Sequence, residues 1–158
     1  MHADVVFLLA LGIGVVTGLR SLTAPAAVSW AAHLGWLDLH DSPFAFMGST
    51  VAVVIFSLLA IAEFAADLRP TTPSRTSPGP LIGRIVIGAF CGACFCASAG
   101  RSLPLGAVLG GVGAVIGAFA GYQARTRLVK ALQVKDPVIA LSEDLVTIAL
   151  AWLLVSYR

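Results

Sequence analysis

Two arginines interrupt long apolar stretches of this chain, and each begins the same tripeptide, Arg-Ser-Leu. The first copy starts at Arg20 and the second at Arg101, 81 residues later. An arginine inside a segment that lies in hydrocarbon costs ~3 to ~15 kcal/mol, so such a residue is a functional candidate by default. The repeated tripeptide therefore predicts a duplicated membrane unit with one arginine-bearing break in each copy.

The composition leaves little room for a soluble domain. Hydrophobic residues make up 58% of the 158 residues and charged residues only 11%, and the mean hydropathy is +0.94. Soluble domains carry about a quarter of charged residues, so we expect an integral membrane protein. The net charge of +2 is small and scattered. Nucleic acid is therefore not an expected partner, because nucleic-acid binding needs a concentrated basic face.

Six apolar runs predict an all-α protein. The runs 48–68 and 138–157 have the ~20 residues that a helix needs to cross a hydrocarbon core of ~30 Å. The two runs around each Arg-Ser-Leu are expected to form a broken-helix hairpin, either of short spans or of a re-entrant pair. The six predicted segments are 4–19, 22–36, 48–68, 85–100, 103–124 and 138–157.

A proline-rich stretch at 69–80 divides the chain into two halves of similar length. Its four prolines and several hydroxyl residues cannot sustain a helix, so it is expected to be a linker. We therefore predict a single membrane domain over 1–158. Its first repeat is expected at 1–68 and its second at 81–158.

The charges of the loops predict the topology. The linker and segment 125–137 are basic, whereas loop 37–43 is acidic. Short basic loops prefer the cytoplasm, and both basic segments lie on one side only if each break reverses the chain. Each half then crosses an odd number of times, so the halves are inverted repeats, an arrangement common in transporters. We expect a bacterial inner-membrane protein with linker 69–80 and segment 125–137 cytoplasmic and both termini periplasmic.

The two breaks predict a substrate-binding site at the repeat interface. Unwound backbone, helix N-termini and a guanidinium together suit an anion or a phosphate headgroup. Arg20, Ser21, Arg101 and Ser102 are therefore expected to bind substrate. The alternative is that the arginines reach the lipid headgroups or pair with a buried carboxylate as structural groups.

Two carboxylates complete the expected site. Glu63 and Asp144 lie inside apolar runs and are candidate partners of Arg20, members of a proton relay, or cation ligands. Asp67 shares a helix face with Glu63 through its i, i+4 spacing, but it is expected at the membrane interface. Structural ion pairing is an equally good interpretation of these carboxylates.

Small residues predict close helix packing in the second half. Glycines recur at i, i+4 along segment 103–124, which lets helix backbones approach each other in lipid. We favour packing within the chain, with a homodimer face as the alternative. The glycines in question are Gly106, Gly110, Gly113, Gly117 and Gly121.

Neither a cofactor nor catalysis is expected. Cys91, Cys94 and Cys96 lie in an apolar run without a fourth metal ligand, so they are expected to act as small apolar residues. The sequence has no recognisable catalytic motif. Ser21 and Ser102 have no nearby histidine base, so the protein is not expected to be an enzyme.

Two motifs resemble a bacterial domain-of-unknown-function family of small inner-membrane proteins. They are Gly-Leu-Arg-Ser-Leu-Thr-Ala-Pro at 18–25 and Asp-Leu-Arg-Pro at 67–70, with Gly83-Arg84 following the linker. In that family the second motif more often begins Asp-Lys-x-Pro, so the basic residue is shifted by one here. The resemblance spans the chain and implies an inner-membrane protein without an assigned activity.

The sequence therefore predicts a small inner-membrane transporter or channel for an anionic or phosphate-headgroup substrate. One alternative is a cation- or proton-coupled carrier that uses Glu63, Asp67 and Asp144. Another is a membrane scaffold that transports nothing.

Overall fold

The computed structural model describes residues 3–67, 76–132 and 136–157. Every regular element within these ranges is a helix, which confirms the all-α prediction. The elements are α1 (Ala3–Leu19), α2 (Thr23–His33), the short 3-10 helix η1 (Ala45–Gly48), α3 (Thr50–Asp67), α4 (Pro78–Ser98), α5 (Leu103–Leu132) and α6 (Asp136–Ser156).

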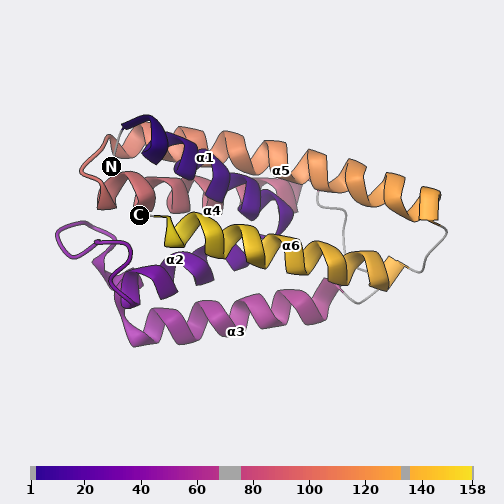
Figure 1. The fold of residues 1–158 in the computed structure, drawn as a ribbon, viewed down its shortest axis with the longest axis horizontal. Helices are drawn as coiled ribbons and strands as arrows, with labels where there is room; N and C mark the ends of the chain where they lie inside the picture. Colours follow the sequence, from indigo (N-terminus) through magenta and orange to yellow (C-terminus); the bar gives the residue numbers. More distant parts are fainter. Residues whose placement is uncertain (1–2, 68–75, 133–135, 158) are drawn as a thin grey trace.

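The helices pack in two layers (Figure 1). In one layer α1, α4 and α5 pack extensively against one another. In the other, α2 contacts α3, α6 and η1. The apolar core lies between the layers and includes the fully buried side chains of Ile13, Val28 and Phe95.

Glycines bring the backbones of α1, α4 and α5 into direct contact. A side chain at Gly14 would overlap the carbonyl of Gly110, and one at Gly110 would overlap the carbonyl of Gly88. Small residues at i, i+4 permit this approach, so the ladder of α5 packs within the chain, as expected from the sequence. The homodimer alternative stays a prediction. Four of its five glycines already make such contacts: Gly106, Gly110, Gly113 and Gly117.

Both Arg-Ser-Leu breaks reverse the chain, as the loop charges predict (Figure 1). The reversal after α4 is a Schellman turn, in which Gly100 has a φ of 61° and the N–H of Arg101 donates to the carbonyl of Cys96 at 2.7 Å. Glycine adopts this left-handed conformation without the clash that a Cβ would cause.

Because the chain reverses at both breaks, the helix ends form two groups at opposite ends of the molecule. The ends of α3 and α5 lie with the starts of α4 and α6 at one end of the molecule, and both termini lie at the other (Figure 1). The basic Arg84, Arg125 and Arg127 belong to the first group of helix ends. We call this end the basic end.

The two helices that qualify as membrane spans among the described residues both belong to the hairpin of the second half. Among the described residues, Pro78–Ser98 and Leu103–Leu128 are long and apolar enough to cross a bilayer. The full spans predicted at 48–68 and 138–157 each include residues whose side chains are outside the described part of the chain, so they stay predictions. α4 is longer than expected because it begins at Pro78, and a proline in the first turn of a helix loses no hydrogen bond.

The two hairpins differ in size. α1 and α2 have 17 and 11 residues, whereas α4 and α5 have 21 and 30. The halves share the order of a hairpin followed by a further helix, but they are not copies of one another in length. The inverted repeat therefore stays a prediction.

The loop between α2 and α3 covers the end of the bundle opposite the basic end. Leu37, Leu39 and Met47 from this region are buried in the apolar core. Trp36 packs edge-on against Trp152 of α6, with 4.9 Å between the ring centroids. Apolar packing therefore closes this end.

Replacing Gly110 by alanine should destabilise the fold. The new Cβ would meet the backbone of α4, and overpacking of this kind costs ~1 to ~3 kcal/mol. Gly83→Ala is the matched control, because no atom lies within 4 Å of a Cβ built there. Thermal unfolding in detergent, followed by circular dichroism, should give a lower midpoint for Gly110→Ala and an unchanged or higher one for Gly83→Ala. Equal midpoints would contradict the backbone contact.

Candidate functional site

The helix break at Arg20 leaves backbone carbonyl and N–H groups inside the bundle that need hydrogen-bond partners. α1 ends at Leu19 and α2 begins at Thr23, with three residues between them. The last carbonyls of a helix and the first N–H groups of the next have no partner within their own helices. A buried polar group without a hydrogen bond costs ~1 to ~3 kcal/mol, so these groups require partners from elsewhere.

Arg84 of α4 satisfies the end of α1. Its Nη1 donates to the carbonyl oxygen of Gly18 at 2.8 Å and to that of Thr17 at 3.3 Å. The Arg84 side chain is only 7% exposed. A cation at a helix C-terminus also interacts favourably with the helix dipole, so Arg84 is a capping group supplied by another helix.

Glu63 of α3 satisfies the start of α2. Its Oε1 accepts the N–H of Ser21 and its Oε2 accepts the N–H of Leu22, both at 2.9 Å. Arg84 Nη2 lies 4.0 Å from Oε1 of the same carboxylate. Two backbone N–H groups at a helix N-terminus and a nearby guanidinium are the groups that bind anions in proteins. We call them the anion cradle.

Arg20 itself pairs with Asp144 of α6. Its Nε donates to Oδ1 of Asp144 at 2.5 Å, and Nη2 contacts the same oxygen. The guanidinium also stacks on Phe64 of α3, with Cζ 4.1 Å from the ring centroid. The side chains of Arg20 and Asp144 are 2% and 9% exposed, so this ion pair is buried.

These four side chains form one group, the break cluster, composed of Arg20, Glu63, Arg84 and Asp144. The formal charges sum to zero, which is the condition under which charges are tolerated in an apolar interior. They come from α3, α4 and α6 and from the break after α1, so the cluster joins both layers of the bundle. Its α2 contact is to backbone N–H groups at the start of that helix.

The cluster contains three of the six sequence-predicted site residues, and a fourth, Ser21, donates its backbone N–H to the cluster. Arg20, Ser21, Glu63 and Asp144 lie together, and Asp144 is the partner of Arg20 that the sequence proposed. Arg101 and Ser102 do not join them: both are exposed in the Schellman turn, at the opposite end of the bundle from the start of α4. Repetition of a tripeptide therefore did not give two equivalent sites.

Arg84 is the site residue that sequence reasoning misses. The sequence predicts Arg84 to lie in the loop, because the predicted helix begins one residue later, at 85. The signal that could have found it is the proline pair Pro78 and Pro80, which fits the first turn of a helix and moves Arg84 inside it. An arginine two turns into an apolar helix would then need a partner.

A further buried oxygen lies at the start of α2. Thr23 is the first residue of that helix and is 6% exposed, and its Oγ1 has no hydrogen-bond partner among the described residues. It follows directly on the two N–H groups that bind Glu63. The start of α2 therefore holds one buried hydroxyl oxygen that makes no hydrogen bond with the described residues.

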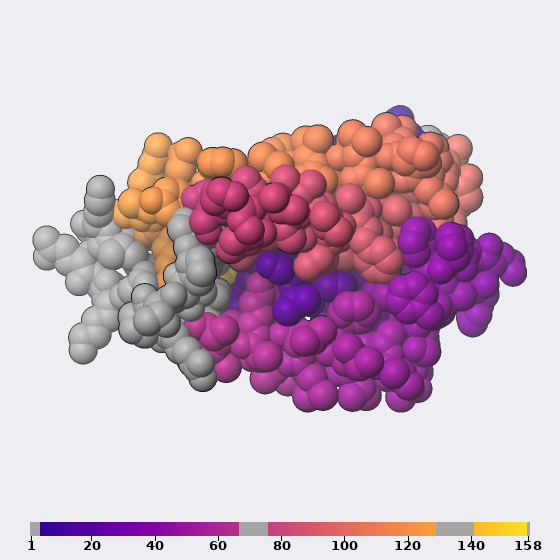
Figure 2. All heavy atoms as spheres, turned by 180° about the vertical axis from the view of Figure 1, so that it is seen from behind, coloured from indigo at the N-terminus to yellow at the C-terminus, as the bar shows by residue number. Residues whose placement is uncertain are grey.

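The surface is hollowed between α3 and α4. Figure 2 shows this hollow between the two helices, with the indigo N-terminal segment visible at its bottom. α3 packs against α2 and η1 instead of against α4. Glu63 of α3 and Arg84 of α4 reach towards each other across this gap.

The cysteines lie apart from this cluster. Cys91, Cys94 and Cys96 are free thiols buried in α4, and Cys96 Sγ lies against Gly106. Across the ranges that the structure describes, no three His, Cys, Asp or Glu side chains are grouped as metal ligands.

The fold and the site define a class: an all-α bundle with a broken helix and a neutral cluster of buried charges at the break. The chain belongs to the family described as a domain of unknown function, DUF4126, whose family model matches residues 7–157. The matched range contains the whole break cluster. No match was found among curated proteins or among solved structures.

The Arg20–Asp144 pair should show strong energetic coupling. Removing either partner alone leaves a buried charge uncompensated, which costs ~3 to ~5 kcal/mol. Arg20→Gln and Asp144→Asn should each lower the unfolding midpoint strongly, whereas the double variant should lose clearly less than the sum of the two. Arg127→Gln, at an exposed position of α5, is the control and should change little. Additive losses in the double-mutant cycle would argue against the pair.

Proposed function

We propose that this protein is a multi-pass membrane transporter for an anion or a phosphate headgroup, and that its substrate site is the anion cradle at the α1–α2 break. The observation that carries the proposal is the set of groups that bind the Glu63 carboxylate. Its carboxylate is held by two backbone N–H groups at a helix N-terminus, with a guanidinium close by. A phosphate oxygen makes the same contacts as a carboxylate oxygen.

The membrane location is supported by the outer surface as well as by the two candidate spans. Many large apolar side chains point outward, and in water so much apolar surface would promote association. Examples from four helices are Leu58 of α3, Val86 of α4, Val108 of α5 and Leu153 of α6, each more than 60% exposed. Such side chains are expected where a helix faces lipid.

The orientation follows from the charges. The basic end belongs in the cytoplasm by the rule that short basic loops stay inside. In a bacterial inner membrane this places the linker 69–80 and segment 125–137 in the cytoplasm and both termini in the periplasm. The break cluster then lies in the cytoplasmic half of the bilayer, because Arg84 and Asp144 are about two turns from the helix starts at the basic end.

In this proposal Glu63 is the resting occupant of the cradle. An incoming phosphate group would displace the Glu63 carboxylate from the N–H groups of Ser21 and Leu22 and interact with Arg84. The hollow between α3 and α4 offers an approach to this place (Figure 2). Displacement needs little disruption of the packing between α3 and α4, because α3 packs mainly against α2 and η1.

The alternative of a cation- or proton-coupled carrier rests on the same carboxylates. Glu63 and Asp144 are only partly accessible and lie in one cluster, as members of a proton relay would. Asp67, the third carboxylate of that alternative, has a side chain outside the described residues. A scaffold without transport would use the cluster only to hold the helices together.

Transport should depend on Arg84 and not on Arg101. In proteoliposomes loaded with wild-type protein, we expect uptake of radiolabelled inorganic phosphate or movement of a fluorescent phospholipid between leaflets. Arg84→Gln should reduce the rate at least about tenfold, the loss expected for one charge-assisted contact. Arg84→Lys should keep part of it, and Arg101→Gln should match the wild type, because Arg101 is exposed away from the cluster.

The outcomes separate the three functions. Wild-type rates for either probe in a folded Arg84→Gln variant would contradict the anion site. Proton flux that persists in Arg84→Gln but is lost in Glu63→Gln would favour the cation- or proton-coupled carrier. Wild-type protein that moves neither probe nor protons would be a scaffold.

A further inference from the structure

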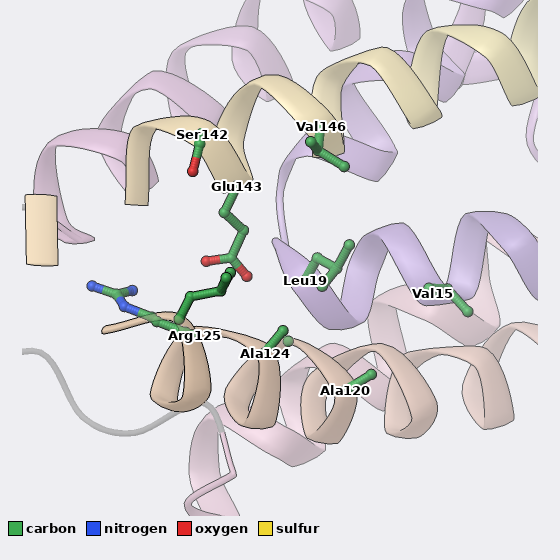
Figure 3. A pocket seen from close by; sticks show the side chains of 10 residues that line it. Val15, Leu19, Ala120, Ala124, Arg125, Ser142, Glu143 and Val146 are labelled. Atoms are coloured by element: carbon green, nitrogen blue, oxygen red, sulfur yellow. The ribbon is translucent and has the colours of Figure 1, made fainter. Parts of the chain in front are cut away.

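A buried hydroxyl group at the start of α2 is not used by the contacts of the break cluster. Thr23 is 6% exposed, and its Oγ1 makes no hydrogen bond with the described residues. Native folds seldom leave a buried hydroxyl without a hydrogen bond, and functional sites are among the exceptions. The pocket between α1, α5 and α6, by contrast, is lined mainly by apolar side chains such as Val15, Leu19 and Val146 (Figure 3).

The break before α2 explains why Thr23 differs from other buried threonines. The Oγ1 atoms of Thr17 and Thr147 donate to backbone carbonyls four residues earlier in their own helices, at 2.9 and 2.7 Å. Four residues before Thr23 is Leu19, which is the last residue of α1, and the chain reverses between the two (Figure 1). The helix of Thr23 therefore offers it no carbonyl at this spacing.

Helix geometry places the Thr23 side chain on the side of the anion cradle. In an α-helix the Cα–Cβ bonds tilt towards the N-terminus, so a side chain of the first residue lies over the start of its helix. The N–H groups of Ser21 and Leu22, which bind the Glu63 carboxylate, directly precede Thr23 in the chain. The start of α2 thus combines two N–H donors with one hydroxyl donor, and the guanidinium of Arg84 is close by.

The Glu63 carboxylate uses only the two N–H donors. Each of its oxygens accepts one N–H at 2.9 Å, and neither accepts a hydrogen bond from Thr23 Oγ1. A carboxylate has no third oxygen. A phosphodiester also has only two non-bridging oxygens, whereas a phosphate monoester has three. A third donor therefore distinguishes a phosphate monoester from both of the other groups.

We propose that Thr23 is a specificity-determining residue of the anion cradle, and that the cradle selects a terminal phosphate group with three non-bridging oxygens. Two of these oxygens accept the N–H groups of Ser21 and Leu22 in place of Glu63, and the third accepts the Thr23 hydroxyl. The inference rests on the anion site of the proposed function, and it narrows the substrate class to phosphate monoesters. Such a group can belong to a soluble phosphate or end the headgroup of a lipid.

The test compares monoesters with diesters by isothermal titration calorimetry of the full chain in detergent. Methyl phosphate and dimethyl phosphate are the soluble pair. Phosphatidic acid and phosphatidylmethanol with identical acyl chains are the lipid pair. For the wild type we expect a monoester to bind at least about tenfold more tightly than its diester. Binding of methyl phosphate would assign the soluble source, and binding of phosphatidic acid alone would assign the lipid.

Thr23→Val removes the hydroxyl and keeps the shape of the side chain. It should weaken binding of the monoester about tenfold and leave binding of the diester unchanged, because only the monoester presents a third oxygen. Thr23→Ser should keep the wild-type affinities. Thr147→Val, which removes a buried hydroxyl that already has a hydrogen bond, is the matched control and should also keep them.

The stability of Thr23→Val supplies a second measurement. Without ligand its unfolding midpoint should equal or exceed that of the wild type, because an apolar group replaces a hydroxyl that has no hydrogen bond with the described residues. A lower midpoint would show that the hydroxyl has a partner within the fold and would overturn the inference.

The binding outcomes separate this inference from the proposed function. Wild-type affinity of Thr23→Val for the monoester would overturn the role of Thr23, since the hydroxyl would then bind at most a buried water. Equal binding of monoester and diester by the wild type would also overturn it, and either result would leave the anion cradle intact. A wild type that binds none of the four phosphates would contradict the anion cradle and, with it, this inference.

Discussion

The interrupted backbone between α1 and α2 is the constraint around which the rest of the molecule is arranged. A helix that stops inside an apolar bundle leaves carbonyls at its end and N–H groups at the next start that need hydrogen-bond partners. Arg84 binds the carbonyls of Gly18 and Thr17, and Glu63 binds the N–H groups of Ser21 and Leu22. Two helices that are remote in sequence are thereby tied to the break, and Asp144 ties a third through Arg20.

This arrangement depends on the close packing of α1 with α4 and α5. Glycines at the contacts let the backbones touch, so the base of Arg84 lies near enough to α1 for its guanidinium to reach Gly18. The other layer is packed differently. α3 stands against α2 and η1, and it reaches the break through Glu63. The tightly packed layer of α1, α4 and α5 thus supplies the Arg84 guanidinium. The layer that contains α3, which has the hollow beside it, supplies the Glu63 carboxylate (Figure 2).

Much of this molecule can be predicted from residues with a strong local signal. Apolar runs locate the helices to within a few residues, except at the start of α4 and the end of α5, and the loop charges predict both reversals. Because buried charges need partners, the sequence alone makes Asp144 a candidate partner of Arg20. The repeated tripeptide misleads because three residues do not encode how deep in the bundle they lie. Arg101 follows Gly100 in a surface turn, whereas Arg20 follows a helix that ends inside the bundle. Arg84 is not predicted as a site residue, because the position at which α4 begins decides whether this arginine lies within the helix or in the loop before it.

If Glu63 occupies a site that suits an anion, as proposed, the variant Glu63→Ala tests that site most directly. Its thermal unfolding midpoint in detergent should fall below that of the wild type and should recover with inorganic phosphate in a saturable way. Sodium chloride at equal ionic strength should not restore it, and Glu63→Ala combined with Arg84→Gln should not respond to phosphate. A Glu63→Ala midpoint that phosphate raises no more than sodium chloride does would contradict the anion cradle.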